Sequence, residues 1–211
     1  IEGAIKLAKM HTKKSGFIVA LKAFHGKTMG SLSMMGKKDY RQPPGMLYGG
    51  PVYHVPYGDA AALEKQLDIC DKVGVEIAGV LMEPIQGEAG IIIPPDGTLR
   101  RVREICDKNH ILMIADEIQS GLGRTGKMLA CEWENVKPDM VCLGKALSGG
   151  FYPVSAVVGS REVMTVFNPG EHGSTFGGNP LAAAVAIAAL DVLVEEKLVE
   201  RAAELGKIAM D

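Results

Sequence analysis

A lysine and an acid each follow an apolar segment that is typical of a buried strand. Lys145 comes after residues 140–144 and before a glycine-bearing turn, and Asp116 comes directly after residues 111–115. In an α/β protein the carboxyl ends of the strands face the ligand crevice. We therefore expect these two side chains to be delivered to one site.

An acid and a lysine in this arrangement suit pyridoxal phosphate. A partly desolvated lysine amine attacks a carbonyl and forms a Schiff base, while an acid keeps the pyridinium nitrogen protonated. The amine, once released, can act as a general base. Taken singly, Lys145 also fits a solvated surface charge, and Asp116 also fits a helix cap or a loop salt bridge.

Further side chains near strand ends extend this hypothesis. Gln119 can bond a ring oxygen, and Phe24 can stack on a planar ring, although an isolated phenylalanine is more often part of a core. Glu83 and Glu88 lie in a loop with glycine and proline. They fit an acid/base pair, structural anchors, or a charge that neutralises an incoming group.

Two glycine-rich segments suggest anion binding. Residues 170–180 contain Ser174 and Thr175 and lead into a helix, which suits a phosphate as well as a plain capped turn. Residues 121–126 fit the dinucleotide pattern G-x-G-x-x-G, but they do not directly follow a strand, and the next strand does not end in an acid. A dinucleotide oxidoreductase is therefore only a weak alternative.

The elements that must position these residues alternate along the chain. Strands alternating with helices predict an α/β fold with a mainly parallel central sheet and helices on both faces. A long loop is expected at 24–58, and its length favours a functional role. Expected helices span residues 2–13, 59–72 and 98–109 and a stretch from 180 past 190; expected strands span residues 17–21, 77–82, 111–115, 139–143 and 154–159.

The composition is that of an ordinary globular protein. The 211 residues are 47% hydrophobic and 23% charged, with a formal net charge of −2. This balance gives no reason to expect a nucleic-acid or membrane partner, and no motif indicates a metal site. The four cysteines show no C-x-x-C spacing. They indicate a reducing compartment, the cytoplasm, with the mitochondrial matrix as the alternative.

Four motifs together carry a family resemblance. The segments EPIQGE at 83–88, ADEIQ at 115–119, LGKAL at 143–147 and GSTFGGNP at 173–180 resemble the subgroup III, or ω-amino, aminotransferases. These are fold-type I pyridoxal phosphate enzymes. Residues 149–157 and 170–175 look most like the ornithine-using members, whereas residues 23–27 and 54–58 look more like the putrescine-using members.

The resemblance implies a role for each cofactor-binding residue. Lys145 forms the Schiff base, Asp116 pairs with the pyridine nitrogen, and Gln119 contacts the ring hydroxyl. Phe24 stacks on the ring with His25 beside it.

Other residues acquire roles at the subunit interface and at the substrate end. Ser174 and Thr175 are expected to reach the cofactor phosphate of a neighbouring subunit, which implies a homodimer with a shared active site. Glu88 resembles the gate acid that pairs with an arginine between half-reactions, and Glu83 resembles an acid near the substrate end.

The resemblance also implies what this stretch of chain comprises. Residues 1–211 correspond to the central part of the cofactor-binding large domain, without the family's N-terminal segment and C-terminal small domain. The first carries the phosphate-binding turn, and the second carries the arginine that meets the 2-oxoglutarate carboxylate. We therefore expect this piece alone to be inactive, as a non-catalytic cofactor-binding and dimerisation core.

The expected reaction is transfer of a terminal amino group from ornithine to 2-oxoglutarate. Lys27 stands where ornithine-using relatives commonly carry arginine, and lysine lacks the bidentate fork that meets a carboxylate. Putrescine, N-acetylornithine and 4-aminobutyrate therefore stay open as alternative donors.

Overall fold

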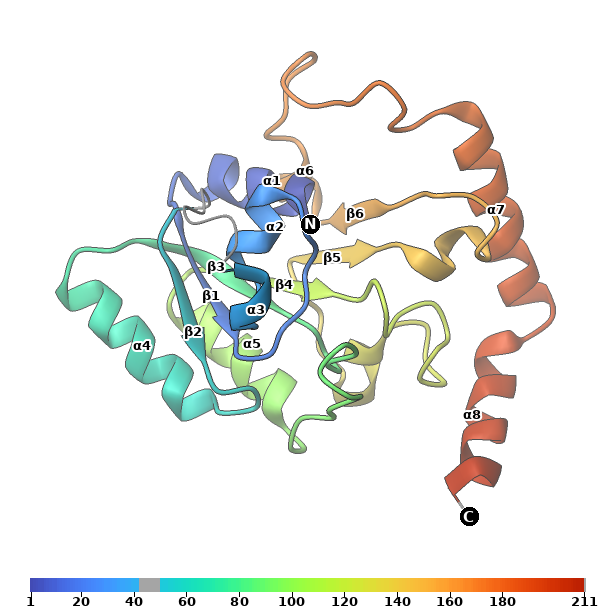
Figure 1. Ribbon diagram of the computed structural model, residues 1–211, viewed down its shortest axis with the longest axis horizontal. Helices are drawn as coiled ribbons and strands as arrows, with labels where there is room; N and C mark the ends of the chain where they lie inside the picture. The colour runs from blue at the N-terminus through green and yellow to red at the C-terminus, as the bar shows by residue number, and fades with distance from the viewer. Residues whose placement is uncertain (42–49, 211) are drawn as a thin grey trace.

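A six-stranded sheet organises the described chain, which comprises residues 1–41 and 50–210 of the computed structural model (Figure 1). The order across the sheet is β2-β1-β3-β4-β5-β6. The strands are β1 (Gly16–Ala20), β2 (Val52–Val55), β3 (Ile77–Met82), β4 (Leu112–Asp116), β5 (Met140–Leu143) and β6 (Ala156–Gly159).

The sheet is parallel except at one edge. The pairs from β2 through β5 are parallel, and only β6 runs antiparallel to its neighbour β5. Parallel strands bring their carboxyl ends to the same edge, where ligands bind in α/β folds. The predicted α/β fold with a mainly parallel sheet is confirmed.

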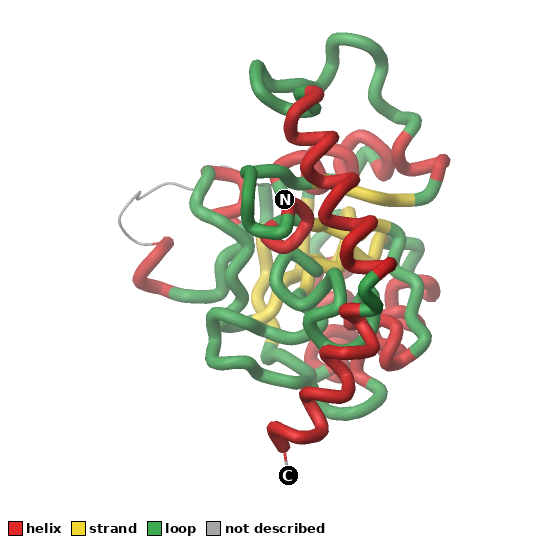
Figure 2. The backbone as a smooth tube through the Cα atoms, turned by 90° about the vertical axis from the view of Figure 1, so that its right-hand side faces the viewer, coloured by secondary structure: helices red, strands yellow, loops and turns green. Residues whose placement is uncertain are grey.

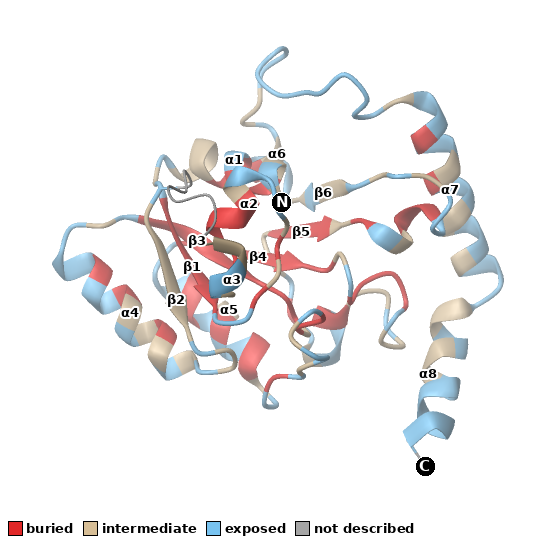
Figure 3. Cartoon of the chain, viewed as in Figure 1, coloured by how far each residue is buried: buried red, intermediate tan, exposed pale blue. Residues whose placement is uncertain are grey.

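Helices cover both faces of this sheet. Phe17 and Val19 of β1 pack with α1 (Glu2–Thr12) and α6 (Arg161–Met164), whereas Ile18 packs on the opposite face with α4 (Ala60–Lys72) and α5 (Thr98–Lys108). Every residue of β1, β3 and β4 is buried, as Figure 3 shows. Continuous apolar strands are what a two-sided burial requires.

Local signals set where several helices begin. Asp59 accepts a hydrogen bond from the Ala62 amide at 2.9 Å and caps α4. Asn179 does the same for the Ala182 amide at 2.9 Å, and Pro180 then opens α7 (Pro180–Glu195). Helices α7 and α8 (Leu198–Met210) run one after the other along one side of the molecule (Figure 2).

The loop expected at 24–58 is partly wrong. Its described residues contain α2 (Met29–Ser33), α3 (Lys38–Arg41) and β2, while residues 42–49 lie outside the described chain. The two helices are too short to show a helical period. Strand β2 is only half-buried at the sheet edge and contains His54, so it lacks the apolar run of the central strands.

Helix α8 was not among the expected elements either. Glu196 and Lys197 separate it from α7, Lys197 has a left-handed φ of 51°, and none of the described residues of α8 is buried. Beyond the main sheet, a small third core packs Ala186 of α7 against Leu122 and Leu147.

The close approach of β3 and β4 gives a first prediction. A Cβ on Gly79 would lie 2.6 Å from the Leu112 carbonyl oxygen, and both belong to paired backbones that cannot move apart freely. Gly79→Ala should lower the free energy of unfolding by about 1–3 kcal/mol. The measurement is urea unfolding followed by circular dichroism.

Gly206→Ala is the control, because nothing lies within 4 Å of a Cβ there and the residue is in α8. It should stabilise by about 0.5–1 kcal/mol. Equal stability of Gly79→Ala and wild type would contradict the tight strand pairing.

Candidate active site

Asp116 is buried at the carboxyl end of β4 and holds the side chain of His25. Its Oδ2 lies 2.8 Å from His25 Nδ1, and its Oδ1 accepts a hydrogen bond from the Ile118 amide at 3.2 Å. The side chains of His25 and Asp116 are 0% and 4% exposed. A buried carboxylate is stable only when such partners replace water, so this pair is a fixed feature of the site.

His25 reaches Asp116 from the turn that follows β1. Its backbone amide donates to Met35 Sδ at 3.1 Å, which holds this turn against the segment after α2. Within the described chain, His25 Nε2 is buried and has no hydrogen-bond partner. A buried polar atom without a partner is unusual in a folded protein and is a group that a bound ligand can satisfy.

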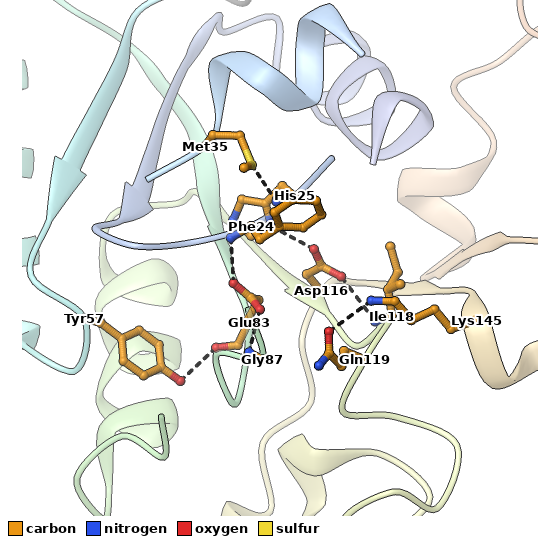
Figure 4. A network of polar contacts seen from close by, with 10 residues as sticks. All are labelled: Phe24, His25, Met35, Tyr57, Glu83, Gly87, Asp116, Ile118, Gln119 and Lys145. Atoms are coloured by element: carbon orange, nitrogen blue, oxygen red, sulfur yellow. Dashed lines mark hydrogen bonds and ion pairs between the residues drawn. The ribbon is translucent and has the colours of Figure 1, made fainter. Parts of the chain in front are cut away.

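Lys145 lies beside Asp116 because β5 pairs with β4. Asp116 is in register with Cys142, and β5 ends one residue later. Lys145 Nζ donates to Gln119 Oε1 at 3.1 Å (Figure 4). The backbone of Lys145 has a φ of 41°, a left-handed conformation that lysine adopts with strain.

Lys145 also borders open space. One cavity of about 980 Å³ lies between Lys145, residues 148–151 and the α7 and α8 helices. Another of about 570 Å³ lies between Lys145, residues 152–155 and residues 176–179. Among the described residues, no carboxylate lies within ion-pair distance of its amine. The amine is therefore open to a ligand from both sides.

Glu83 fixes two loops to each other. Its Oε1 accepts from the Phe24 amide at 2.9 Å, and its Oε2 accepts from the Gly87 amide at 3.0 Å. The Tyr57 hydroxyl adds bonds to the carbonyl oxygens of Glu83 and Pro84, at 3.0 and 2.9 Å. Glu83 thus anchors the Phe24 turn, and its expected contact with substrate stays a prediction.

Burial raises the pKa of the Glu83 carboxyl above its usual 4.5, and the amides of Phe24 and Gly87 act in the opposite direction. Burial also raises the pKa of the Tyr57 phenol, with the charge of Glu83 as a further cause. In both groups the loss of surrounding water disfavours the charged form.

Glu88 is half-exposed on the loop that Glu83 anchors. Its Oε1 lies 3.9 Å from Lys37 Nζ and 3.5 Å from the Tyr40 hydroxyl. Lys37 also donates to the Glu88 carbonyl oxygen at 3.0 Å. The expected partner of Glu88 is an arginine, but in the described chain its cationic partner is Lys37.

The phosphate-binding candidates lie elsewhere. Ser174 and Thr175 belong to the exposed segment between α6 and α7, where Ser174 Oγ accepts from the Gly177 amide at 2.9 Å. The structure brings Phe24, His25, Asp116, Gln119 and Lys145 to one edge of the sheet. Residues 176–179, which follow the two hydroxyls, line one cavity together with Lys145.

Comparisons with known proteins agree on a family. The model of the class-III aminotransferases matches residues 1–211. The chain is 56% identical over 215 residues to the mitochondrial ornithine aminotransferase of Arabidopsis thaliana, covering 98% of the chain and 44% of that protein. The chain belongs to the class-III aminotransferase family.

Solved structures in this family share the fold. The ornithine aminotransferase of Toxoplasma gondii ME49 aligns with a TM-score of 0.91 at 41% identity, over 98% of this chain and 49% of that one. The acetylornithine aminotransferase of Elizabethkingia anophelis aligns with a TM-score of 0.78 at 45% identity, over 98% and 49%. The chain spans about half the length of the class-III aminotransferases that it matches.

The glycine pattern at 121–126 has a packing role. It follows a turn rather than a strand, and no helix begins at its end. A Cβ on Gly126 would lie 2.8 Å from Ala203 Cβ, so the segment allows α8 to approach. The geometry of a dinucleotide site, a tight turn between a strand and a helix, is not present here.

Lys37 and Tyr40 are the site residues that the sequence motifs missed. Both fall inside the stretch expected to be loop, and no motif contains them. The weak available signal was the length of that stretch, which is unusual for a connection without a function.

The raised pKa of Glu83 gives a second prediction. A carboxyl with a higher pKa in the folded than in the unfolded chain stabilises the fold when it is protonated. That contribution to stability is complete at a pH below the pKa in the unfolded chain. It is lost as the pH rises through the pKa in the folded chain. The free energy of unfolding should therefore lose this component as the pH rises from 4.5.

In Glu83→Gln the side chain is uncharged at every pH, so the free energy of unfolding of this variant should not show that pH-dependent decrease. The measurement is urea unfolding of both proteins from about pH 4 to pH 7. Exposed Glu162, in the first turn of α6, gives the control Glu162→Gln, which should follow the wild type. Parallel pH curves for wild type and Glu83→Gln would show that the buried carboxyl does not titrate abnormally.

Proposed function

We propose that this chain carries the reactive centre of a pyridoxal-phosphate-dependent aminotransferase that transfers a terminal amino group from ornithine to 2-oxoglutarate. The observation that carries the proposal is the buried Asp116–His25 pair beside the amine of Lys145. Membership of the class-III family supports it, as do the ornithine aminotransferases of Arabidopsis thaliana and Geobacillus, 56% and 54% identical.

The residues present fit the cofactor. Lys145 borders two cavities, and its amine donates to the neutral amide of Gln119 rather than to a carboxylate among the described residues, which suits a Schiff-base lysine. Asp116 is a buried acid already bound to an imidazole, which suits it to hold a cationic ring nitrogen. Phe24 would cover a ring face, Gln119 would accept from or donate to a ring oxygen, and His25 Nε2 is a buried polar atom still without a partner.

Each residue then has a defined task in the reaction. Pyridoxal phosphate, when bound, supplies an electron-withdrawing ring that stabilises negative charge on the substrate carbon. Asp116 would keep the ring nitrogen protonated, and His25 holds Asp116 through Nδ1. Lys145 would hold the cofactor, and its Nζ would move a proton to or from the substrate carbon. The strands that carry these groups keep them aligned during the step.

Lys145→Ala should lower kcat by at least about 100-fold, because it removes both the attachment point and the general base. Borohydride reduction of the wild-type enzyme should leave a pyridoxyl adduct on the peptide containing Lys145, seen by mass spectrometry. Lys65→Ala, an exposed position on α4, is the matched control and should behave as wild type. Normal turnover by Lys145→Ala would refute the proposal.

The donor is best assigned with a panel of ornithine, putrescine, N-acetylornithine and 4-aminobutyrate on the natural enzyme. Ornithine should give the highest kcat/KM.

For the 211-residue chain alone we propose a cofactor-binding core without turnover, which assays of the chain beside the natural enzyme would test. Its compartment is proposed to be reducing, since the four cysteines are free and buried. Within the described residues, no helix has both the length and the apolar character needed to span a bilayer.

We also propose a homodimer in which Ser174 and Thr175 bind the cofactor phosphate of the partner subunit. Their segment is exposed and is followed by exposed apolar side chains, among them Phe176 and Leu181. Apolar groups exposed next to polar ones are typical of protein interfaces.

Mixed dimers test this arrangement. One subunit carries Lys145→Ala, and the other carries Ser174→Ala with Thr175→Ala. If the hydroxyls act across the interface, the mixed dimer keeps one complete site and should recover activity that neither parent dimer has. The assay is ornithine turnover after co-expression and tandem-tag purification. No recovery above the parents would place the hydroxyls in their own subunit's site.

A further inference from the structure

Tyr40 contacts three residues of the site at once. Its ring meets the edge of the Phe24 ring, with centroids 6.0 Å apart and planes at 83°. Lys27 Nζ lies 4.7 Å from the centroid of the Tyr40 ring, and the Tyr40 hydroxyl lies 3.5 Å from Glu88 Oε1. One half-buried side chain thus connects the ring-stacking candidate, a cation and the gate-acid candidate.

The amine of Lys27 lies over the Tyr40 ring. Its side chain is exposed, and among the described residues no carboxylate lies within ion-pair distance of its amine. An ammonium is a point charge on a flexible stem, so a neighbouring group must set its position. The face of an aromatic ring attracts such a cation and leaves its hydrogen-bond donors free for a ligand.

Glu88 contacts the hydroxyl of Tyr40 and is also held by Lys37. Lys37 donates to its carbonyl oxygen at 3.0 Å and lies 3.9 Å from its carboxylate, and Tyr40 reaches that carboxylate too. The pair is partly exposed, with Lys37 at 30% and Glu88 at 48%, so its strength is modest. Its effect is to neutralise the acid that would otherwise repel an incoming carboxylate.

We propose that Tyr40 is a positioning residue that presents Lys27 to the carboxylate of the amine donor, while Lys37 neutralises Glu88. The segment from Lys37 to Tyr40 then favours donors that carry a carboxylate over diamines of the same length. This inference rests on the proposed aminotransferase function. The Tyr40 ring would fix the position of the Lys27 amine where the donor binds, although lysine lacks the two-pronged guanidinium of arginine.

The test compares two donors that differ by one carboxylate, ornithine and putrescine. Tyr40→Leu removes the ring and should raise the KM for ornithine by about two- to five-fold, the loss expected for an exposed cation–π contact. The KM for putrescine, which has no carboxylate, should rise by less than the KM for ornithine. Tyr40→Phe keeps the ring and should restore the wild-type KM for ornithine.

Two adjacent lysines provide a matched pair for the second arm. Lys37→Met exposes the charge of Glu88 and should raise the KM for ornithine but not for putrescine. Lys38→Met, an exposed neighbour with no contact to the site among the described residues, should change neither. Equal KM changes for both donors in Tyr40→Leu, or no change for either, would overturn the proposal.

A readout without turnover separates this inference from the function on which it rests. In the natural enzyme, 5-aminopentanoate should protect Lys27 from acetylation by acetic anhydride, measured by mass spectrometry against Lys38. Tyr40→Leu should lose much of that protection. If ornithine proves not to be a donor but the protection depends on Tyr40, the proposed donor fails and the positioning role stands. If protection is the same in both proteins, the positioning role fails.

Discussion

The parallel pairing of β1, β3, β4 and β5 is the constraint on which the site depends. It brings the residues that follow each strand to one edge of the sheet, although they are far apart in the chain. His25 follows β1, Glu83 follows β3, Asp116 ends β4 and Lys145 follows β5. A slip in any of these strand pairs would separate the groups, so the pairing of these largely buried strands keeps the reactive groups aligned.

The residues that sequence reasoning found share one property. Asp116, Glu83 and Lys145 follow continuous apolar segments, and such segments can be read as buried strands with little ambiguity. The rule that ligands bind at the carboxyl ends of parallel strands then places their side chains together. The roles of Gln119 and Phe24 needed the resemblance to a family as well, because each alone fits an ordinary turn or core residue.

What escaped the sequence was set by contacts that no local pattern encodes. The hydrogen bond between His25 and Asp116 joins residues 91 positions apart. Tyr40 and Lys37 act from a short helix and its approach, which have too few residues to show a period. For Glu83 the sequence allowed a structural anchor, but which backbone amides its two oxygens accept from depends on how two loops meet. The site's polar framework is therefore a product of tertiary structure.

The left-handed backbone of Lys145 places function and stability in opposition. Glycine adopts a φ of 41° without steric conflict, whereas a lysine there costs about 1–3 kcal/mol unless its surroundings compensate. A design procedure that optimised stability alone would therefore replace this residue with glycine, and only the requirement for an amine at that point favours lysine. The most informative position in the chain is one that a stability criterion would discard.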